Sequence, residues 1–248
     1  MMLSILLPVY NEEKRLKRGI TRTVAYLEHL SFSDYEIIIV DNASSDHTPL
    51  IAAKLASMNS HVKYQRLEIK GVGAAFRKGV EVSHGDVVGY MDIDLSTDIR
   101  HLRNVIKTFQ SRPGVAYING SRFAKASKTT GRKWYRKITS TGLVFLLKLF
   151  FRMKCTDAIC GFTFVRRSTA FELMQVCSTE NGWFYMIEFL LRAERMGKVV
   201  IDYPVRWKED YNTTVRLIPT ICNYIREIAK LFWAFYIQER TFDRQTKK

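Results

Sequence analysis

Short apolar runs alternate with amphipathic stretches along the first half of the chain. The apolar runs are rich in β-branched residues and have the length of buried strands, and the stretches between them carry apolar residues at helical spacing. The predicted strands are residues 3–9, 36–40, 62–67, 87–91 and 115–119. The predicted helices are residues 12–30, with Asn11 as N-cap, and residues 46–58, 74–82 and 98–110.

The second half of the chain has a different character, because residues 133–151 mix lysine and arginine with aromatic and aliphatic side chains. Further strands are expected at 162–165 and 198–203, helices at 185–196 and 217–238, and a polar tail after Glu239. Strands alternating with helices at this spacing predict an α/β fold with a mostly parallel central sheet flanked by helices. No Gly/Ser-rich or Pro-rich linker appears, so a single domain of residues 1–248 is expected.

The charge balance indicates an anionic partner. The 248 residues include 39 Lys and Arg against 24 Asp and Glu, a net charge of +15, which suits nucleic acid, an acidic membrane surface or a phosphorylated substrate. A nucleic-acid-binding module is the weakest of these interpretations, since no helix-turn-helix or zinc-finger pattern is present. The four cysteines lack CxxC spacing and indicate free thiols in a reducing compartment. No apolar run reaches the roughly 18 residues of a membrane span, and the N-terminus does not resemble a signal peptide.

Acidic residues follow the predicted strands. Asp92 and Asp94 stand at i and i+2, so in an extended segment their carboxylates share a face and repel each other unless a cation lies between them. A magnesium or manganese ion that also binds a nucleotide diphosphate fits this arrangement, and a solvated acidic turn is the alternative. Asp41 can accept hydrogen bonds from a nucleobase or ribose, with an Asx turn or helix cap as the alternative.

Three further features have both a functional and a structural interpretation. Residues 71–79 are Gly-rich and open a helix, but they match neither GxGxxG nor a P-loop, and a simple turn is the stronger interpretation. The basic and aromatic run after Arg132 predicts a helix in a membrane interface, against core packing with a solvated basic edge. Glu188 stands in an apolar stretch and is either a functional acid or the ion-pair partner of Arg192 at i+4.

Taken in order, seven motifs resemble the family 2 glycosyltransferases of the GT-A fold, and within them the polyprenyl- and dolichyl-phosphate glycosyltransferases, most nearly the dolichyl-phosphate β-glucosyltransferase branch. Each motif alone is loose, but their order is specific, and the resemblance covers about residues 3 to 216. The motifs are PVYNE, VDNASSD, GVGAAFRKG, MDIDLSTD, NGSR, CTDAICGF and WFYMIEF.

The resemblance implies an inverting transfer from a nucleotide-sugar donor, such as UDP-glucose, to a polyprenyl or dolichyl phosphate, with Mg²⁺ or Mn²⁺ as cofactor. It places the metal at Asp92 and Asp94 and the acceptor phosphate at Arg122 and Arg136. It implies catalytic roles for Asp94, Asp157 and Glu188. By the same resemblance, the residues that bind the nucleotide-sugar are Pro8, Tyr10, Glu12, Asp41, Gly73, Asp92 and Ile93.

The chain also departs from the family pattern. Asn42, Val72 and Tyr185 replace a frequent Asp, Lys and Asp, and the late Gly-x-Ser-Lys-like loop appears only as YNTTVRL. The residues that could replace the loop's contacts with the donor are Arg206, Lys208 and Arg216.

The expected organisation is a nucleotide-sugar half at residues 1–122 and an acceptor and membrane-interface half at 123–248. The expected location is the cytoplasmic face of a membrane, bound peripherally to its anionic surface, with basic amphipathic interfacial helices. The resemblance leaves room for a homo-oligomer. The alternative function is transfer to a soluble or glycan acceptor in cell-surface polysaccharide synthesis.

Overall fold

The computed structural model describes residues 1–210 and 217–238. The chain divides into two compact units. The first comprises Met1–Arg132 and Cys155–Glu209, and the second comprises Lys133–Lys154 and Asp210–Lys248. The predicted boundary after residue 122 therefore falls inside the first unit, and the single domain stays a prediction.

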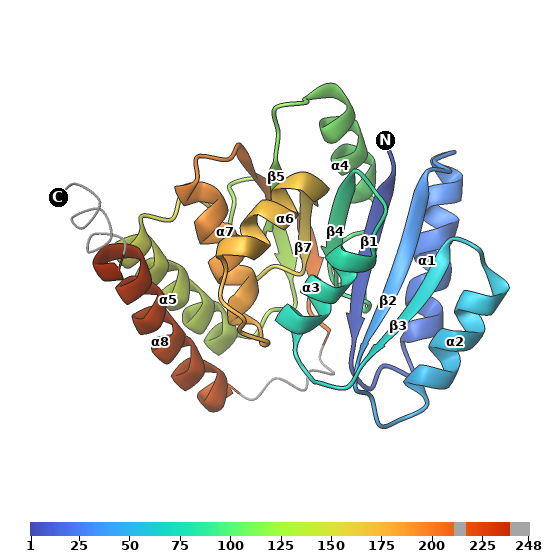
Figure 1. Ribbon diagram of the computed structural model, residues 1–248, viewed down its shortest axis with the longest axis horizontal. Helices are drawn as coiled ribbons and strands as arrows, with labels where there is room; N and C mark the ends of the chain where they lie inside the picture. The colour runs from blue at the N-terminus through green and yellow to red at the C-terminus, as the bar shows by residue number, and fades with distance from the viewer. Residues whose placement is uncertain (211–216, 239–248) are drawn as a thin grey trace. The chain divides into compact units, whose positions relative to one another are not determined.

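The first unit is built on a central sheet. Its strands are β1 (Leu3–Val9), β2 (Tyr35–Asn42), β3 (Val62–Leu67), β4 (Val87–Met91), β5 (Tyr117–Ser121), β7 (Phe162–Arg166) and β8 (Val200–Pro204). In the described residues these form a seven-stranded sheet of order β3-β2-β1-β4-β7-β5-β8 (Figure 1). Every pairing is parallel except those of β7, which runs antiparallel to both β4 and β5. The predicted α/β fold with a mostly parallel sheet is confirmed.

Helices cover both faces of this sheet. The helices of the first unit are α1 (Leu16–His29), α2 (Thr48–Met58), α3 (Val72–Val82), α4 (His101–Ser111), α6 (Arg167–Val176) and α7 (Phe184–Arg195). Side chains of α1, α2 and α4 share one core cluster with Leu3, Ile5 and Leu7 of β1. On the other face α3 packs on β1 and β2, and its Phe76 meets Phe189 of α7 with ring centroids 5.0 Å apart.

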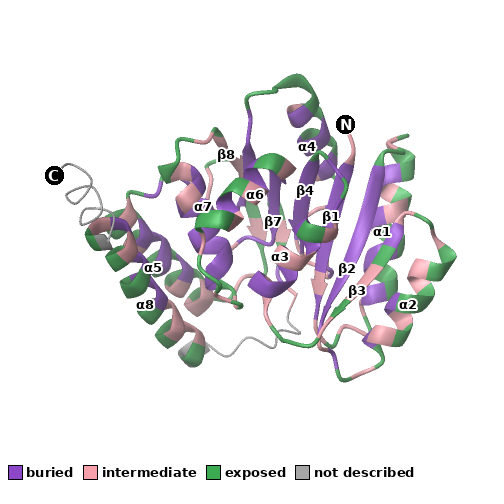
Figure 2. Cartoon of the chain, in the orientation of Figure 1, coloured by how far each residue is buried: buried purple, intermediate pink, exposed green. Residues whose placement is uncertain are grey.

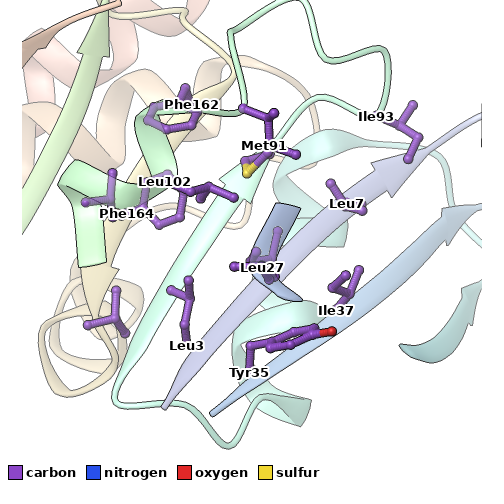
Figure 3. Packing of buried hydrophobic residues seen from close by; sticks show 14 of the residues in the cluster. Leu3, Leu7, Leu27, Tyr35, Ile37, Met91, Ile93, Leu102, Phe162 and Phe164 are labelled. Carbon is purple, nitrogen blue, oxygen red and sulfur yellow. The ribbon is translucent and has the colours of Figure 1, made fainter. Parts of the chain in front are cut away.

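The core lies mainly on the central strands, which Figure 2 shows as buried along most of their length. Leu3, Ile37 and Phe164 are fully buried, and Figure 3 shows them with Leu27 and Leu102 of the covering helices. Full burial of one such side chain contributes about 1.5–3 kcal/mol to the free energy of folding, so strands built from runs of apolar residues stabilise the folded sheet strongly.

The prediction of Asn11 as a helix N-cap is wrong. Helix α1 begins at Leu16, and Asn11 has a left-handed backbone with φ 55°. Its side chain instead accepts a hydrogen bond from the Ser45 backbone N–H at 2.9 Å, joining the loops after β1 and β2. The structure also contains α6 and a two-stranded parallel sheet of β6 (Lys128–Thr130) and β9 (Arg206–Lys208), none of which the sequence pattern predicted.

The second unit contains two long helices and a short extension. They are α5 (Trp134–Phe151), α8 (Leu217–Trp233) and the π-helical turn η1 (Ala234–Gln238). Aromatic rings join them: Phe150 meets Phe232 and Phe151 meets Phe235, with ring centroids 5.9 and 5.6 Å apart. Within the described part of the chain, no helix has the length and apolar character to cross a bilayer. The polar tail predicted after Glu239 lies outside the described residues.

A buried carboxylate at the amino-terminal edge of the sheet makes stability depend on pH. Glu36 is 2% exposed and accepts hydrogen bonds from Lys63 Nζ (2.5 Å), Ser4 Oγ (2.6 Å) and the His84 N–H (2.6 Å). Burial alone would raise the pKa of Glu36, but these hydrogen bonds and the Lys63 charge outweigh it, so the pKa is lowered.

We therefore expect Glu36 to stabilise the fold above its unfolded pKa of about 4.3, and this contribution to be lost as the pH falls through the lower folded value. Denaturant unfolding between pH 7 and pH 3 checks this. The free energy of unfolding should fall less steeply with acid in Glu36→Gln than in the wild type. Glu81→Gln, at an exposed ion pair with Lys78, is the matched control and should leave the slope unchanged. Equal slopes in wild type and Glu36→Gln would contradict the prediction.

Candidate active site

The carboxyl ends of β1, β2, β4 and β5 lie at one edge of the sheet, because all four strands run the same way. Met91 is paired with Phe162, so the loop before β7 lies beside the end of β4. Ligands of open α/β sheets bind at this edge. The predicted site residues that lie in the last two positions of these strands, directly after them or before β7 are Pro8, Tyr10, Glu12, Asp41, Asp92, Ile93, Asp94, Arg122 and Asp157.

Asp92 and Asp94 are held at the end of β4 by local hydrogen bonds. The Asp92 N–H donates to the Gly161 carbonyl (3.2 Å), and its Oδ1 accepts from the Tyr90 hydroxyl (3.0 Å). Asp94 Oδ1 accepts from the Ser96 N–H (2.8 Å). Burial and the Asp94 charge raise the pKa of Asp92 to about 7, against the opposing effects of Tyr90 and Arg122. The Asp92 and Asp94 carboxylates therefore repel each other, and a cation between them would relieve this repulsion.

Arg122 and Asp157 form a buried two-point ion pair. Arg122 Nε and Nη2 lie 2.7 and 2.9 Å from Asp157 Oδ2 and Oδ1, and the Arg122 N–H also donates to Oδ2 (3.1 Å). The side chains are 9% and 0% exposed. Burial raises the pKa of Asp157, but Arg122 outweighs it and the pKa is lowered. Arg122 thus meets a carboxylate inside the protein, and its contact with an acceptor phosphate stays a prediction.

Asp41 is fully buried at the end of β2. Its Oδ2 accepts from the Tyr64 hydroxyl (3.0 Å) and from Arg66 Nη1 (3.2 Å), and its Oδ1 accepts from the Ser44 N–H (2.9 Å). The last contact is a local bond to the backbone three residues along the chain, one residue further than in the Asx turn that the sequence left as an alternative for Asp41. Tyr64 and Arg66 on β3 were not among the predicted residues, although the register places Arg66 directly beside Asp41.

The segment after β1 is tied to neighbouring loops. Lys70 Nζ lies 3.3 Å from the ring centroid of Tyr10, and the Glu12 carboxylate pairs with Arg15 Nε at 2.6 Å. The Glu12 N–H donates to Thr48 Oγ1 at 2.7 Å. A lysine over an aromatic ring at the predicted donor pocket adds a positive charge where a nucleotide diphosphate would need one.

Gly73 serves helix packing. Its N–H donates to the carbonyls of Asn181 (2.8 Å) and Gly182 (3.0 Å), and a Cβ at this position would lie 2.5 Å from the Cβ of Tyr185. Glycine is therefore needed here for the close approach of α3 to the loop before α7. Its contact with the donor stays a prediction.

Comparisons with known proteins bear on this arrangement. The sequence model described as "Glycosyl transferase family 2" matches residues 4–173. The chain belongs to this family. It is 31% identical over 98% of its length to the glycosyltransferase AglD of Haloferax volcanii, of which it spans 39%. It is 30% identical over 84% of its length to the dolichyl-phosphate beta-glucosyltransferase of Drosophila melanogaster, of which it spans 67%.

Solved structures show the same fold. Glucosyl-3-phosphoglycerate synthase of Mycobacterium tuberculosis, in complex with Mn²⁺, UDP and glucosyl-3-phosphoglycerate, matches 94% of this chain and 79% of its own, with a TM-score of 0.64 and 16% identity. The GT-A type of α/β fold expected from the resemblance is confirmed.

The remaining predicted residues of this glycosyltransferase lie away from the sheet edge or in the second unit. Glu188 on α7 is 2% exposed and pairs with Arg192 Nε at 2.7 Å, which is the helical ion pair that the sequence left open. Arg136 lies on α5 in the second unit. The catalytic role of Glu188 and the phosphate contact of Arg136 stay predictions. Arg216, one replacement for the late loop, lies outside the described residues.

The structure adds residues that the sequence did not single out. Trp207 of β9 has the guanidinium carbons of Arg122 and Arg132 at 5.5 and 5.8 Å from its ring centroid. An isolated bridge pairs Trp207 with Thr97, three residues after Asp94. The sequence offered a signal for Trp207, because this tryptophan stands directly between Arg206 and Lys208.

Asp92 and Asp94 fit a divalent cation that also binds phosphate oxygens. Among the described residues, no three His, Cys, Asp or Glu side chains gather into a complete metal site. Burial and the Asp94 charge raise the pKa of Asp92, so a nearby positive charge would favour its ionised form. Magnesium and manganese ions usually take only one or two carboxylates and complete their shell with water and substrate phosphates, which suits a two-carboxylate site.

Proposed function

We propose that this glycosyltransferase moves a sugar from a nucleotide-sugar, such as UDP-glucose, to a polyprenyl or dolichyl phosphate, with inversion at the anomeric carbon. The observation that carries the proposal is the placement of Asp92 and Asp94 at the sheet edge beside the buried Arg122–Asp157 pair. The similarity to a dolichyl-phosphate beta-glucosyltransferase supports the acceptor class. The bound UDP and Mn²⁺ of the mycobacterial synthase support the donor and cofactor classes.

Mg²⁺ or Mn²⁺ held by Asp92 and Asp94 would neutralise the negative charge that develops on the leaving diphosphate. Asp41, Tyr10 and Lys70 are proposed to line the nucleotide side of the pocket. An acceptor phosphate is already largely ionised near neutral pH, so its attack needs little help from a general base. The protein's main task is then to align the phosphate oxygen with the anomeric carbon.

This chemistry suggests a positioning role for Asp157. Both of its carboxylate oxygens accept hydrogen bonds from the Arg122 side chain, which lowers its pKa and makes it a poor proton acceptor. We propose that Asp157 fixes the Arg122 guanidinium, and that Arg122 in turn presents positive charge towards the Asp92 side of the site, because the Arg122 charge lowers the pKa of Asp92 against the larger effect of burial.

Transfer from UDP-glucose, UDP-N-acetylglucosamine, UDP-galactose and GDP-mannose to dolichyl phosphate with Mn²⁺ tests the function. We expect one labelled sugar to appear in a lipid-phosphate product of inverted anomeric configuration. Parallel reactions with soluble oligosaccharide acceptors test the alternative, a glycan-modifying transferase. Transfer to the glycans alone would overturn the proposed acceptor.

The second unit is proposed to bind the anionic cytoplasmic face of a membrane. Large apolar side chains form an exposed stripe at helical spacing on α5, and exposed basic side chains accompany them. The stripe consists of Trp134, Ile138, Phe145 and Leu149, which are 73%, 62%, 63% and 61% exposed. The basic residues are Lys133, Lys137, Lys148 and Arg152. Exposed apolar residues of this size in one stripe are typical of interaction surfaces.

Replacing the four stripe residues by serine is expected to release the protein from anionic vesicles and to lower transfer to dolichyl phosphate more than to a short soluble polyprenyl phosphate. Salt should release the wild type only in part, because charge attraction is screened and apolar burial is not. Vesicle flotation at two salt concentrations measures both effects. The matched control is Leu50→Ser with Met58→Ser, two exposed apolar residues of α2 in the first unit.

Phe151 is unsuitable for this test because it packs against Phe232 and Phe235 within the second unit. If the wild type floats with neither anionic nor neutral vesicles, the membrane surface is not a partner and the soluble acceptor is favoured.

A further inference from the structure

Two residues of no assigned role enclose the Asp92 carboxylate. The first is Tyr90 on β4, two residues before Asp92, which comes directly after the last residue of the strand, so that both side chains lie on the same side of the chain. Its hydroxyl donates to Asp92 Oδ1 at 3.0 Å, and its side chain is 3% exposed.

The second residue is Gly161, in the loop before β7. A Cβ on Gly161 would lie 1.8 Å from Asp92 Oδ2 and 2.2 Å from its Cγ. Gly161 is not among the residues with positive φ, so glycine is needed here for space and not for its backbone freedom. The Gly161 carbonyl also accepts the Asp92 N–H at 3.2 Å. The Asp92 side chain thus lies directly on the Gly161 backbone.

Together these contacts fix the orientation of a carboxylate that its neighbour repels. Asp94 carries the same charge two residues away, and repulsion favours rotation of the Asp92 side chain away from it. Among the described residues, the Tyr90 hydroxyl is the side chain that donates a hydrogen bond to Asp92. The Gly161 backbone leaves room for Oδ2 in this orientation, and any side chain at position 161 would displace it.

We propose that Tyr90 and Gly161 are positioning residues that hold Asp92 in the orientation needed for a divalent cation shared with Asp94. This inference rests on the proposed metal-dependent donor binding. It extends the site by one hydroxyl on β4 and one close backbone contact from the loop before β7. Residues that orient metal ligands typically change metal affinity by about 10- to 100-fold when they are replaced.

The test measures Mn²⁺ affinity in the presence of UDP, by the loss of the free Mn²⁺ electron paramagnetic resonance signal, which does not depend on turnover. We expect Tyr90→Phe and Gly161→Ala each to weaken Mn²⁺ binding by about 10- to 100-fold. UDP binding without metal, measured by calorimetry, should stay unchanged, which a general loss of structure would not allow.

Two control variants match these changes elsewhere in the first unit. Tyr117→Phe removes the hydroxyl of another fully buried tyrosine of the sheet, on β5. Gly114→Ala adds a methyl group where a Cβ meets no atom within 4 Å. Both controls should keep wild-type Mn²⁺ affinity. If Gly161→Ala does not fold, as judged by circular dichroism, Tyr90→Phe alone decides, because it removes one oxygen and adds no volume.

The outcomes separate this inference from the proposed function. If the wild type binds Mn²⁺ with UDP and Tyr90→Phe binds it equally well, the positioning role is overturned while the metal site stands. If the wild type itself binds no Mn²⁺ in the presence of UDP, the proposed metal-dependent function fails, and this inference fails with it.

Discussion

Asp94→Asn is expected to abolish metal-dependent binding of a nucleotide diphosphate and to lower kcat/KM by about 10²- to 10³-fold, because it removes the charge that holds the cation against the leaving diphosphate. Asparagine keeps an oxygen that can accept from the Ser96 N–H, so the loop should fold as before. Calorimetry of UDP with and without Mn²⁺ measures the effect on binding, and steady-state kinetics measure the effect on turnover.

Asp98→Asn is the matched control for this variant. Asp98 lies in the same loop, but its carboxylate pairs with the exposed Arg100 at 2.6 Å. It should bind UDP with the same metal dependence as the wild type. Unchanged metal-dependent affinity in Asp94→Asn would remove Asp94 from the metal site.

Asp157→Ala is expected to destabilise the first unit by about 3–5 kcal/mol, because it leaves the Arg122 guanidinium buried without its carboxylate. Arg122→Ala should cost a similar amount for the converse reason. Removing both partners, as in Arg122→Met with Asp157→Leu, should cost less than the sum, since neither charge is left alone. Urea unfolding of the three variants measures these differences.

The exposed ion pair of Asp98 and Arg100 provides the comparison, and Arg100→Ala should cost less than about 1 kcal/mol.

Kinetics separate stability from function. If Arg122 also meets the acceptor phosphate, Arg122→Lys should raise the KM for the lipid acceptor and leave that for the donor unchanged. If only the KM for the donor rises, Arg122 would instead contact the pyrophosphate of the donor. If Asp157→Ala lowers the free energy of unfolding by as little as Arg100→Ala does, the stabilising role of the buried pair is contradicted.

The sequence predicts the elements that are dominated by apolar burial. Exposure of runs such as EIIIV to water is unfavourable, and each of the five apolar runs predicted in the first half of the chain forms a strand of the sheet. The same patterns do not contain the order of the strands. Because β7 enters between β4 and β5 from a distant part of the chain, the sheet brings together Arg122 and Asp157, which are 35 residues apart. Their pairing depends on that insertion, and no local pattern reveals it.

Short polar elements escape prediction for a different reason. Strands β6 (KTT) and β9 (RWK) are three residues long and consist mainly of polar and basic residues, so they carry neither an apolar run nor an alternating pattern long enough to predict a strand. The contact between Tyr90 and Asp92 is different, because the i and i+2 spacing at the end of an extended strand already predicts that both side chains lie on the same face. The contact of Gly161 with Asp92 could not be predicted from the sequence, because a glycine in a sequence does not show which neighbouring group occupies the space beside it.

The small sheet of β6 and β9 lies where the chain leaves the first unit. The chain passes from the first unit to the second just after each of these strands, following Arg132 and Glu209, and the strands are paired in parallel at the points of exit. On its other side, β9 is hydrogen-bonded to the segment after Asp94, through the Lys208 N–H to the Ser96 carbonyl at 2.8 Å. The strand from which the chain leaves the first unit after Glu209 is therefore hydrogen-bonded to the loop that bears the Asp94 carboxylate, so the connection to the second unit begins within a few residues of the proposed metal site.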